Sequence, residues 1–202
     1  MSWRFKNFNA AELVVCADRF LEEAHDFARK RPKAATTQWT DFVLDWFWGV
    51  RGEGITVDAS PTKTPGAPSP RVCYGEFMLD MSHTTYPQYT ADCIYHSRPY
   101  WKNALSRPCE IRLALESEMG RFRGGDETYV RVLEDAAKLP AVRANVKVMV
   151  FASHDGGDRA EIVDSLRDLR LQGRDQAPWL WIDLPWVDDS NDQWGADAGV
   201  FS

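Results

Sequence analysis

The stretch Ile111–Met119, which reads IRLALESEM, places two glutamates one residue apart directly after a run of mostly apolar residues. Side chains alternate between the two faces of a β-strand, so Glu116 and Glu118 would project from the same side. Two carboxylates held side by side repel each other, and they are tolerated where water reaches them or where a cation lies between them. The pattern therefore indicates either the wet face of an edge strand or a site that holds a cation.

A third acid, Asp80, comes near the end of another segment that reads as a strand, residues 71–81. If this segment pairs with the glutamate strand, Asp80 approaches Glu116 across the sheet and three carboxylates converge. Oxygen ligands of this kind bind Mg²⁺ (or Mn²⁺), and such ions activate water in phosphodiester cleavage. The predicted metal ligands are therefore Asp80, Glu116 and Glu118, and Glu118 is also a candidate base.

A lysine follows in the next predicted helix. Lys138 comes three residues after Asp135 and four after Glu134, a spacing typical of an intrahelical ion pair that contributes about 0.2–0.5 kcal/mol. Alternatively, Lys138 reaches over the sheet to the acids, where it would orient water or stabilise a developing charge. The sequence leaves both interpretations open, and Lys147 on the following strand is a lesser candidate for the same role.

The periodicity of apolar residues predicts the elements that must position these side chains. Helices are expected over residues 10–30, 36–48, 124–139 and 158–171, the second of them capped by Thr36 or Thr37. Strands are expected over residues 55–59, 71–81, 111–119, 145–152 and 179–184, and the stretch 82–108 is expected to be irregular.

This order predicts one α/β domain that spans residues 1–202. Its mixed central sheet would combine a three-strand meander with parallel strands and would carry helices on both sides. The core is expected over roughly residues 10–184, and residues 185–202 are expected to form an acidic tail.

The same order of elements, with Asp80, then Glu116-x-Glu118, then a helix that carries Lys138, resembles the PD-(D/E)XK nuclease superfamily and its restriction-endonuclease-like fold. The resemblance covers roughly residues 10–184. It extends to uncharacterised bacterial proteins in which a stretch like LALESE is followed by one like DAAKL.

The resemblance implies Mg²⁺-dependent hydrolysis of nucleic acid, DNA more than RNA, and it is compatible with a homodimer that cuts both strands. The chain departs from the family pattern at two positions: Leu79 rather than proline precedes Asp80, and Glu118 stands where a lysine is usual. Some restriction enzymes of the superfamily use Glu-x-Glu, and in other members the lysine has moved to the adjacent helix, where Lys138 lies.

Composition restricts the remaining possibilities. The chain has 202 residues and a net charge of −6. Its four cysteines include no Cys-x-x-Cys pair, and this pattern favours a reduced, cytoplasmic protein. No apolar run approaches the length of about 20 residues that a membrane span needs. Five of the acidic residues lie at or after Asp183, so the rest of the chain is nearly neutral and permits a groove that faces phosphate groups.

Two other functions are alternatives to the nuclease. A catalytically inactive binding module on the same fold would contact a protein or nucleic acid, for example through the aromatic-rich stretch 86–101. A glycosidase fits poorly, because glutamates one residue apart on a strand point the same way and cannot flank a sugar bond.

Overall fold

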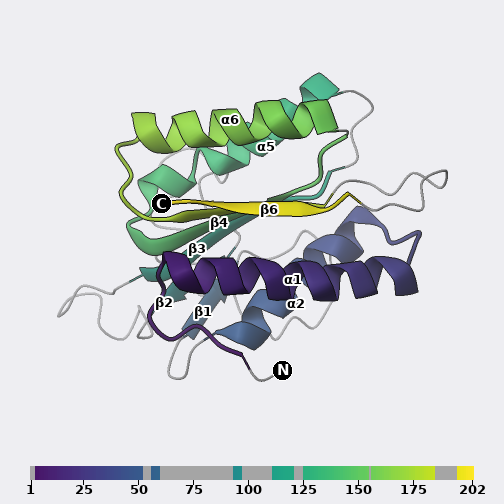
Figure 1. The fold of residues 1–202 in the computed structure, drawn as a ribbon, viewed down its shortest axis with the longest axis horizontal. Helices are drawn as coiled ribbons and strands as arrows, with labels where there is room; N and C mark the ends of the chain where they lie inside the picture. The colour runs from purple at the N-terminus through teal and green to yellow at the C-terminus, as the bar shows by residue number, and fades with distance from the viewer. Residues whose placement is uncertain are drawn as a thin grey trace.

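The computed structural model describes residues 3–51, 56–59, 93–96, 111–120, 125–154, 156–184 and 195–202. A six-stranded mixed β-sheet forms the middle layer, and helices cover both of its faces (Figure 1). The α/β class and the mixed sheet that the sequence predicts are therefore confirmed.

The described helices are α1 (Ala10–Lys30), α2 (Thr36–Val50), α5 (Gly125–Ala136) and α6 (Gly156–Gln172), with a short 3-10 helix, η2 (Leu139–Ala141). The strands are β1 (Thr56–Ala59), β2 (Cys93–His96), β3 (Ile111–Glu118), β4 (Ala144–Phe151), β5 (Trp179–Asp183) and β6 (Asp197–Phe201). All four predicted helices are present.

The strands lie in the order β1-β2-β3-β4-β5-β6. β2 is antiparallel to both of its neighbours, β1 and β3, whereas β3, β4 and β5 run parallel and β6 returns antiparallel to β5. The parallel connections pass through α5 and α6, which lie together on one face, while α1 and α2 cover the other face (Figure 1). The carboxyl ends of β3, β4 and β5 consequently share one edge of the sheet.

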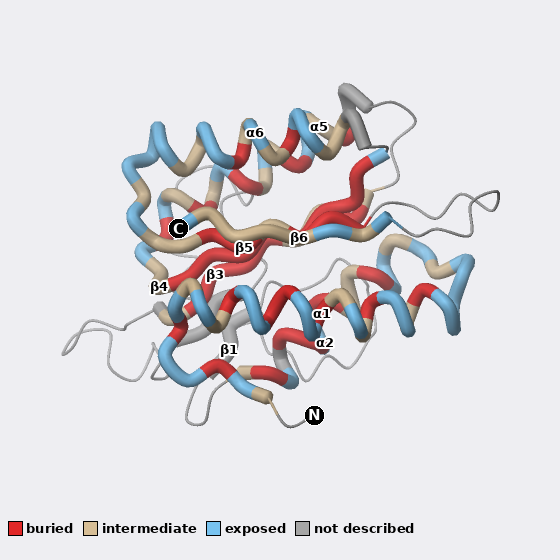
Figure 2. Tube along the Cα trace, viewed as in Figure 1, coloured by how far each residue is buried: buried red, intermediate tan, exposed pale blue. Residues whose placement is uncertain are grey.

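Two apolar cores separate these layers. Figure 2 shows buried segments along the central strands and on the sides of the helices that face them. One core joins α1 and α2 to the sheet through Leu113 and Leu115, and the other joins α5 and α6 to the opposite face through Ala114. β4 contributes to both, and its last six residues are buried, as its apolar sequence predicts.

The ends of α1 and α2 are fixed by side-chain hydrogen bonds. The side chain of Asn9 accepts the N–H of Glu12 (3.1 Å) at the start of α1. At the start of α2 the capping residue is Ala35, whose N–H donates to the side chain of Gln38 (2.9 Å). The prediction of Thr36 or Thr37 as the cap is wrong, because the glutamine supplies the acceptor from inside the first turn.

Two strands depart from the sequence prediction. β2 lies within the stretch 82–108 that was expected to be irregular, and it is this strand that pairs with β3 over residues Ile111–Leu115. β6 lies within the predicted acidic tail and extends the sheet beyond β5. The predicted strand over residues 71–81, with Asp80, lies outside the described residues.

Candidate functional site

Strand β3 presents Glu116 and Glu118 on the face that α5 and α6 cover. Ala114, which shares their place in the alternation, is buried in the core with those helices, whereas Leu113 and Leu115 are buried in the core with α1 and α2. The predicted common face of the two glutamates is thereby confirmed. The interpretation as a wet edge strand is wrong, because β3 is hydrogen-bonded to β2 on one side and to β4 on the other.

Lys138 brings its ammonium group to Glu116. The distance from Lys138 Nζ to Glu116 Oε2 is 3.3 Å, the glutamate side chain has no exposed surface, and 13% of the lysine side chain is exposed. A buried carboxylate loses its hydration and is stable only where a cation or hydrogen bonds compensate. The structure therefore shows the predicted reach of Lys138 over the sheet.

The turn between α5 and η2 fixes the position of this lysine. Lys138 donates its backbone N–H to the carbonyl of Asp135 (3.1 Å), and its own carbonyl accepts the N–H of Ala141 (3.1 Å). Leu139 is fully buried in the core beside α5, and Pro140 stands in the first turn of η2. The backbone of Lys138 is thus held between a helix end and a buried leucine.

Asp135, in the last turn of α5, is the second partner of the lysine. Lys138 Nζ lies 2.6 Å from Asp135 Oδ1, so the predicted pair with Asp135 and the reach to Glu116 exist together. The pair is not intrahelical as predicted, because α5 ends at Ala136 and Lys138 lies in the turn that follows. The ammonium group consequently bridges a carboxylate of the sheet and a carboxylate of the helix.

Asp135 also lies near Glu118, and its negative charge acts on that residue. Burial raises the pKa of Glu118 and the nearby Asp135 raises it further, although the N–H of Gly120, which donates to Glu118 Oε1 (2.6 Å), acts in the opposite direction. The raised pKa favours the protonated form of Glu118 more than water would.

The carboxylates have the oxygen chemistry that Mg²⁺ prefers, and Glu116 and Glu118 are the described residues that would hold such an ion. Within the described ranges, however, no three His, Cys, Asp or Glu side chains are arranged as a metal-binding group. Asp80 lies outside those ranges. A complete divalent-ion site would therefore need at least one further oxygen ligand from the remaining part of the chain.

Lys147, the lesser candidate, has other partners. It is buried on β4, forms an ion pair with Asp175, and its ammonium lies 5.7 Å from the centroid of the Trp179 ring. Burial lowers the pKa of Lys147, while the hydrogen bond to Asp175 raises it. The structure thus joins Lys147 to the chain segment that precedes β5.

A second polar cluster, which the sequence reasoning missed, lies at the carboxyl ends of β4 and β5. Asp183 has no exposed side-chain surface and accepts the backbone N–H of Ser153 (2.8 Å), the Ser153 hydroxyl (2.7 Å) and Arg159 Nε (2.5 Å). Burial raises the pKa of Asp183, whereas these hydrogen bonds lower it. Arg159 also donates to the carbonyl of Gly195 and lies 3.6 Å from Asp197. The only sequence signal is that a polar residue follows or ends each parallel strand.

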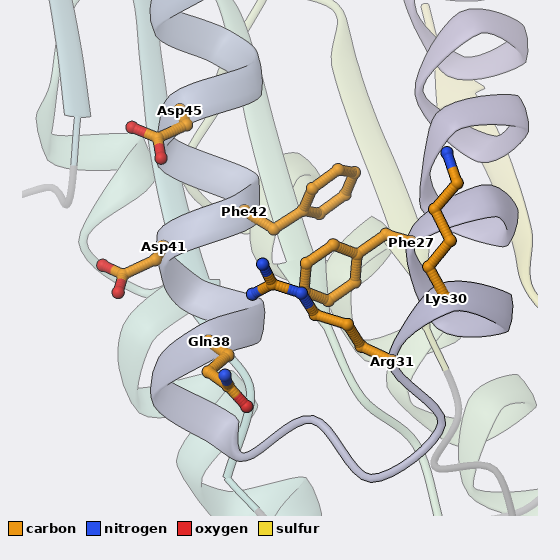
Figure 3. Close-up of a pocket in the computed structure, with 7 residues that line it drawn as sticks. All are labelled: Phe27, Lys30, Arg31, Gln38, Asp41, Phe42 and Asp45. Carbon is orange, nitrogen blue, oxygen red and sulfur yellow. The ribbon is translucent and has the colours of Figure 1, made fainter.

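A hollow of about 490 Å³ lies between α1 and α2, across the sheet from Glu116 (Figure 3). The rings of Phe27 and Phe42 stack with centroids 4.6 Å apart, and the Arg31 guanidinium lies 5.5 Å from the centroid of the Phe27 ring. The other lining residues are Lys30, Gln38, Asp41 and Asp45. This hollow is separate from the carboxylates of β3.

Among the described helices, none combines the length and the apolar character that crossing a membrane requires. Comparisons with protein-family models, with curated proteins and with solved structures find no match to this chain.

Proposed function

We propose that the chain is a Mg²⁺-dependent nuclease with a restriction-endonuclease-like fold that hydrolyses phosphodiester bonds in nucleic acid, DNA in the first place. The observation that carries the proposal is the contact between Lys138 and Glu116. It joins a lysine that follows helix α5 by two residues to the acid strand, which is close to the arrangement that the PD-(D/E)XK resemblance implies when the lysine has moved to the adjacent helix.

The order of the elements supports the same proposal. Among the described elements, the order is α1, then the antiparallel pairs β1-β2 and β2-β3, then α5 and the parallel strand β4, with α2 after the first helix. The acids lie towards the carboxyl end of β3, at the edge where open α/β sheets commonly bind ligands.

The roles of the residues follow from their chemistry. Glu116 and Glu118, with Asp80, would hold the Mg²⁺, which supplies positive charge to the transferred phosphoryl group and lowers the pKa of a bound water. The Lys138 ammonium would orient the attacking water or stabilise the charge that develops on phosphate oxygens. Glu118 would be the base that accepts a proton from that water.

An Asp80→Ala variant would show whether the reaction requires this aspartate.

The test is cleavage of supercoiled plasmid, single-stranded DNA and RNA in Mg²⁺ and in Mn²⁺. We expect metal-dependent cleavage that falls by at least about 100-fold in Glu116→Gln, since one lost charge-stabilising group commonly has this effect. Glu134→Gln is the matched control, because Glu134 is an exposed acid on the neighbouring helix that pairs with Arg131. A folded wild-type protein that cleaves none of these substrates, or equal activity in Glu116→Gln, contradicts the proposal.

One observation favours a second candidate, a catalytically inactive binding module on the same fold. Glu116 is buried and Lys138 already provides a cation beside it. Such a module would bind a protein or nucleic acid partner without taking up Mn²⁺, so calorimetric titration with Mn²⁺ separates the two candidates. Sedimentation of the free protein would also show whether it forms the homodimer expected of an enzyme that cuts both strands.

A further inference from the structure

We infer that Asp135 is a positioning residue of this site: it holds the ammonium group of Lys138 against Glu116. The inference rests on the proposed function for its catalytic meaning. The positioning itself is a property of the chain that can be measured without any cleavage assay.

A short and partly shielded ion pair joins Asp135 to Lys138. The Asp135 carboxylate lies 2.6 Å from Lys138 Nζ, closer than the 3.3 Å between the same ammonium group and Glu116. Only 22% of the Asp135 side chain is exposed, so water screens this interaction less than it screens an ion pair on the surface.

The geometry explains why the contact between Lys138 and Glu116 depends on Asp135. A lysine side chain has four rotatable carbon–carbon bonds, and holding it in one position costs conformational entropy. A single contact at 3.3 Å is long for a charge-assisted hydrogen bond, whereas 2.6 Å is short. Asp135 therefore supplies the stronger of the two attachments, and Lys138 would leave Glu116 more often without it.

The test measures how fast acetic anhydride modifies the amine of Lys138. Each folded variant is treated with the reagent and then digested with a protease, and the modified peptides are quantified by mass spectrometry. Lys30, whose side chain is 70% exposed, is the internal reference in every sample. An amine engaged by two carboxylates reacts slowly. We expect slow modification of Lys138 in the wild-type protein and a rate about three- to tenfold higher in Asp135→Asn, since one charge-assisted hydrogen bond is lost.

Two further variants separate positioning from general loosening of α5. Glu134→Gln removes the adjacent acid of the same helix, which contacts Arg131, and it should leave the rate at Lys138 unchanged. Asp135→Glu retains a carboxylate and should restore most of the slow modification. The inference is overturned if Asp135→Asn has no effect, if Glu134→Gln has an equal effect, or if Lys138 of the wild-type protein reacts as fast as Lys30.

The catalytic meaning has its own readout. If the protein cleaves DNA, Asp135→Asn should lower kcat about tenfold and leave KM nearly unchanged, because a misplaced lysine weakens interactions of the transition state rather than substrate binding. An unchanged kcat would overturn the positioning role in catalysis. A wild-type protein without nuclease activity would refute the proposed function, whereas the modification rates would still decide whether Asp135 positions Lys138.

Discussion

Lys138 Nζ lies 3.3 Å from Glu116 Oε2, although 22 positions of sequence separate the two residues. The contact exists because α5 returns over the sheet after β3. The turn that follows α5 places Lys138 directly before the buried Leu139. It neutralises a carboxylate that has no exposed surface. The pair is therefore both the central feature of the candidate site and a condition for burying Glu116.

The first prediction concerns the stability of this pair. Lys138→Met leaves the Glu116 carboxylate buried without its ammonium partner, and we expect the free energy of unfolding at pH 7 to fall by about 3 kcal/mol. Urea unfolding followed by tryptophan fluorescence measures the change. Lys30→Met is the matched control, because Lys30 is 70% exposed and lies 3.7 Å from Asp26, and it should change the stability by less than about 0.5 kcal/mol.

A double variant tests whether the loss comes from the pair itself. Glu116→Gln removes the buried charge, so adding Lys138→Met to it should be less harmful than Lys138→Met alone by about 1–3 kcal/mol. If the losses in free energy of unfolding simply add in the double variant, the two residues stabilise the fold independently. That result would contradict the contact between Lys138 and Glu116.

The second prediction concerns Asp183. Asp183→Asn cannot accept hydrogen bonds at both side-chain positions, so it disturbs the contacts with Ser153 and Arg159, and we expect a loss of about 3 kcal/mol at pH 7. The pKa of Asp183 is raised in the folded protein, so the folded state binds more protons than the unfolded state between the ordinary value of 3.8 and the raised value. The contribution of Asp183 to the free energy of unfolding consequently increases as the pH falls through that window. The difference in free energy of unfolding between the wild-type protein and Asp183→Asn should therefore become larger.

Chemical denaturation of both proteins at several pH values between 4 and 7 would measure this gap. Asp197→Asn serves as the control, because Asp197 is 54% exposed and lies 3.6 Å from Arg159, and its effect should stay below about 0.5 kcal/mol. A gap that narrows steadily towards acid pH would mean that the hydrogen bonds outweigh burial and that the pKa of Asp183 is lowered.

Periodic apolar residues made the helices and the central strands predictable. The stripe of α1 and the continuous apolar run of β4 follow from packing on one face and on two faces, and both signals are local. β6 was missed because Asp197 and Gly199 are poor strand formers, and the strand exists through its pairing with β5. β2 was missed because it has only four residues, and these form a strand through their pairing with β1 on one side and β3 on the other.

The candidate site was predictable only in part. Alternation placed Glu116 and Glu118 on one face, and the spacing allowed Lys138 either of its two partners. The approach of Asp135 to Glu118 depends on how α5 packs over β3, which no spacing in the sequence reveals. The contact of Ser153 with Asp183 depends on β4 and β5 being parallel neighbours, a property of the topology.

The third prediction uses the close contact between β5 and β6. Trp181 is paired with Gly199, and a methyl group at Gly199 would lie 2.7 Å from Cζ2 of the indole ring. Gly199→Ala must therefore displace the ring or the strand, and we expect it to destabilise the fold by about 1–3 kcal/mol. In Gly195→Ala the added methyl would be 3.7 Å from the nearest atom, on Arg159, and this control should change the stability by less than about 0.5 kcal/mol.

Thermal unfolding of the two alanine variants gives the comparison, and Trp181→Leu in the Gly199→Ala background gives the cause. If steric overlap with the indole is responsible, Gly199→Ala should cost much less once Trp181 is leucine. An equal cost in both backgrounds would assign the effect to the backbone of β6 instead.

The fourth prediction concerns Lys147, whose pKa in the folded protein lies below the ordinary value of 10.5 because the residue is buried. Between the lowered value and 10.5 the unfolded chain binds more protons than the folded chain, so this group makes the free energy of unfolding rise with pH. Lys147→Met removes this contribution. As the pH increases from 7 to 10, the free energy of unfolding of the wild-type protein should rise relative to that of the variant, by up to about 1.4 kcal/mol per pH unit.

Urea unfolding of both proteins across this range measures the difference. The buried thiol of Cys16 acts in the opposite sense, since its raised pKa keeps it protonated in the folded state while the unfolded thiol ionises above about 9. Both proteins contain Cys16, so its effect cancels in the comparison. A difference that is constant with pH would mean that the ion pair with Asp175 offsets the burial of Lys147, and that the ammonium is as stable in the fold as in water.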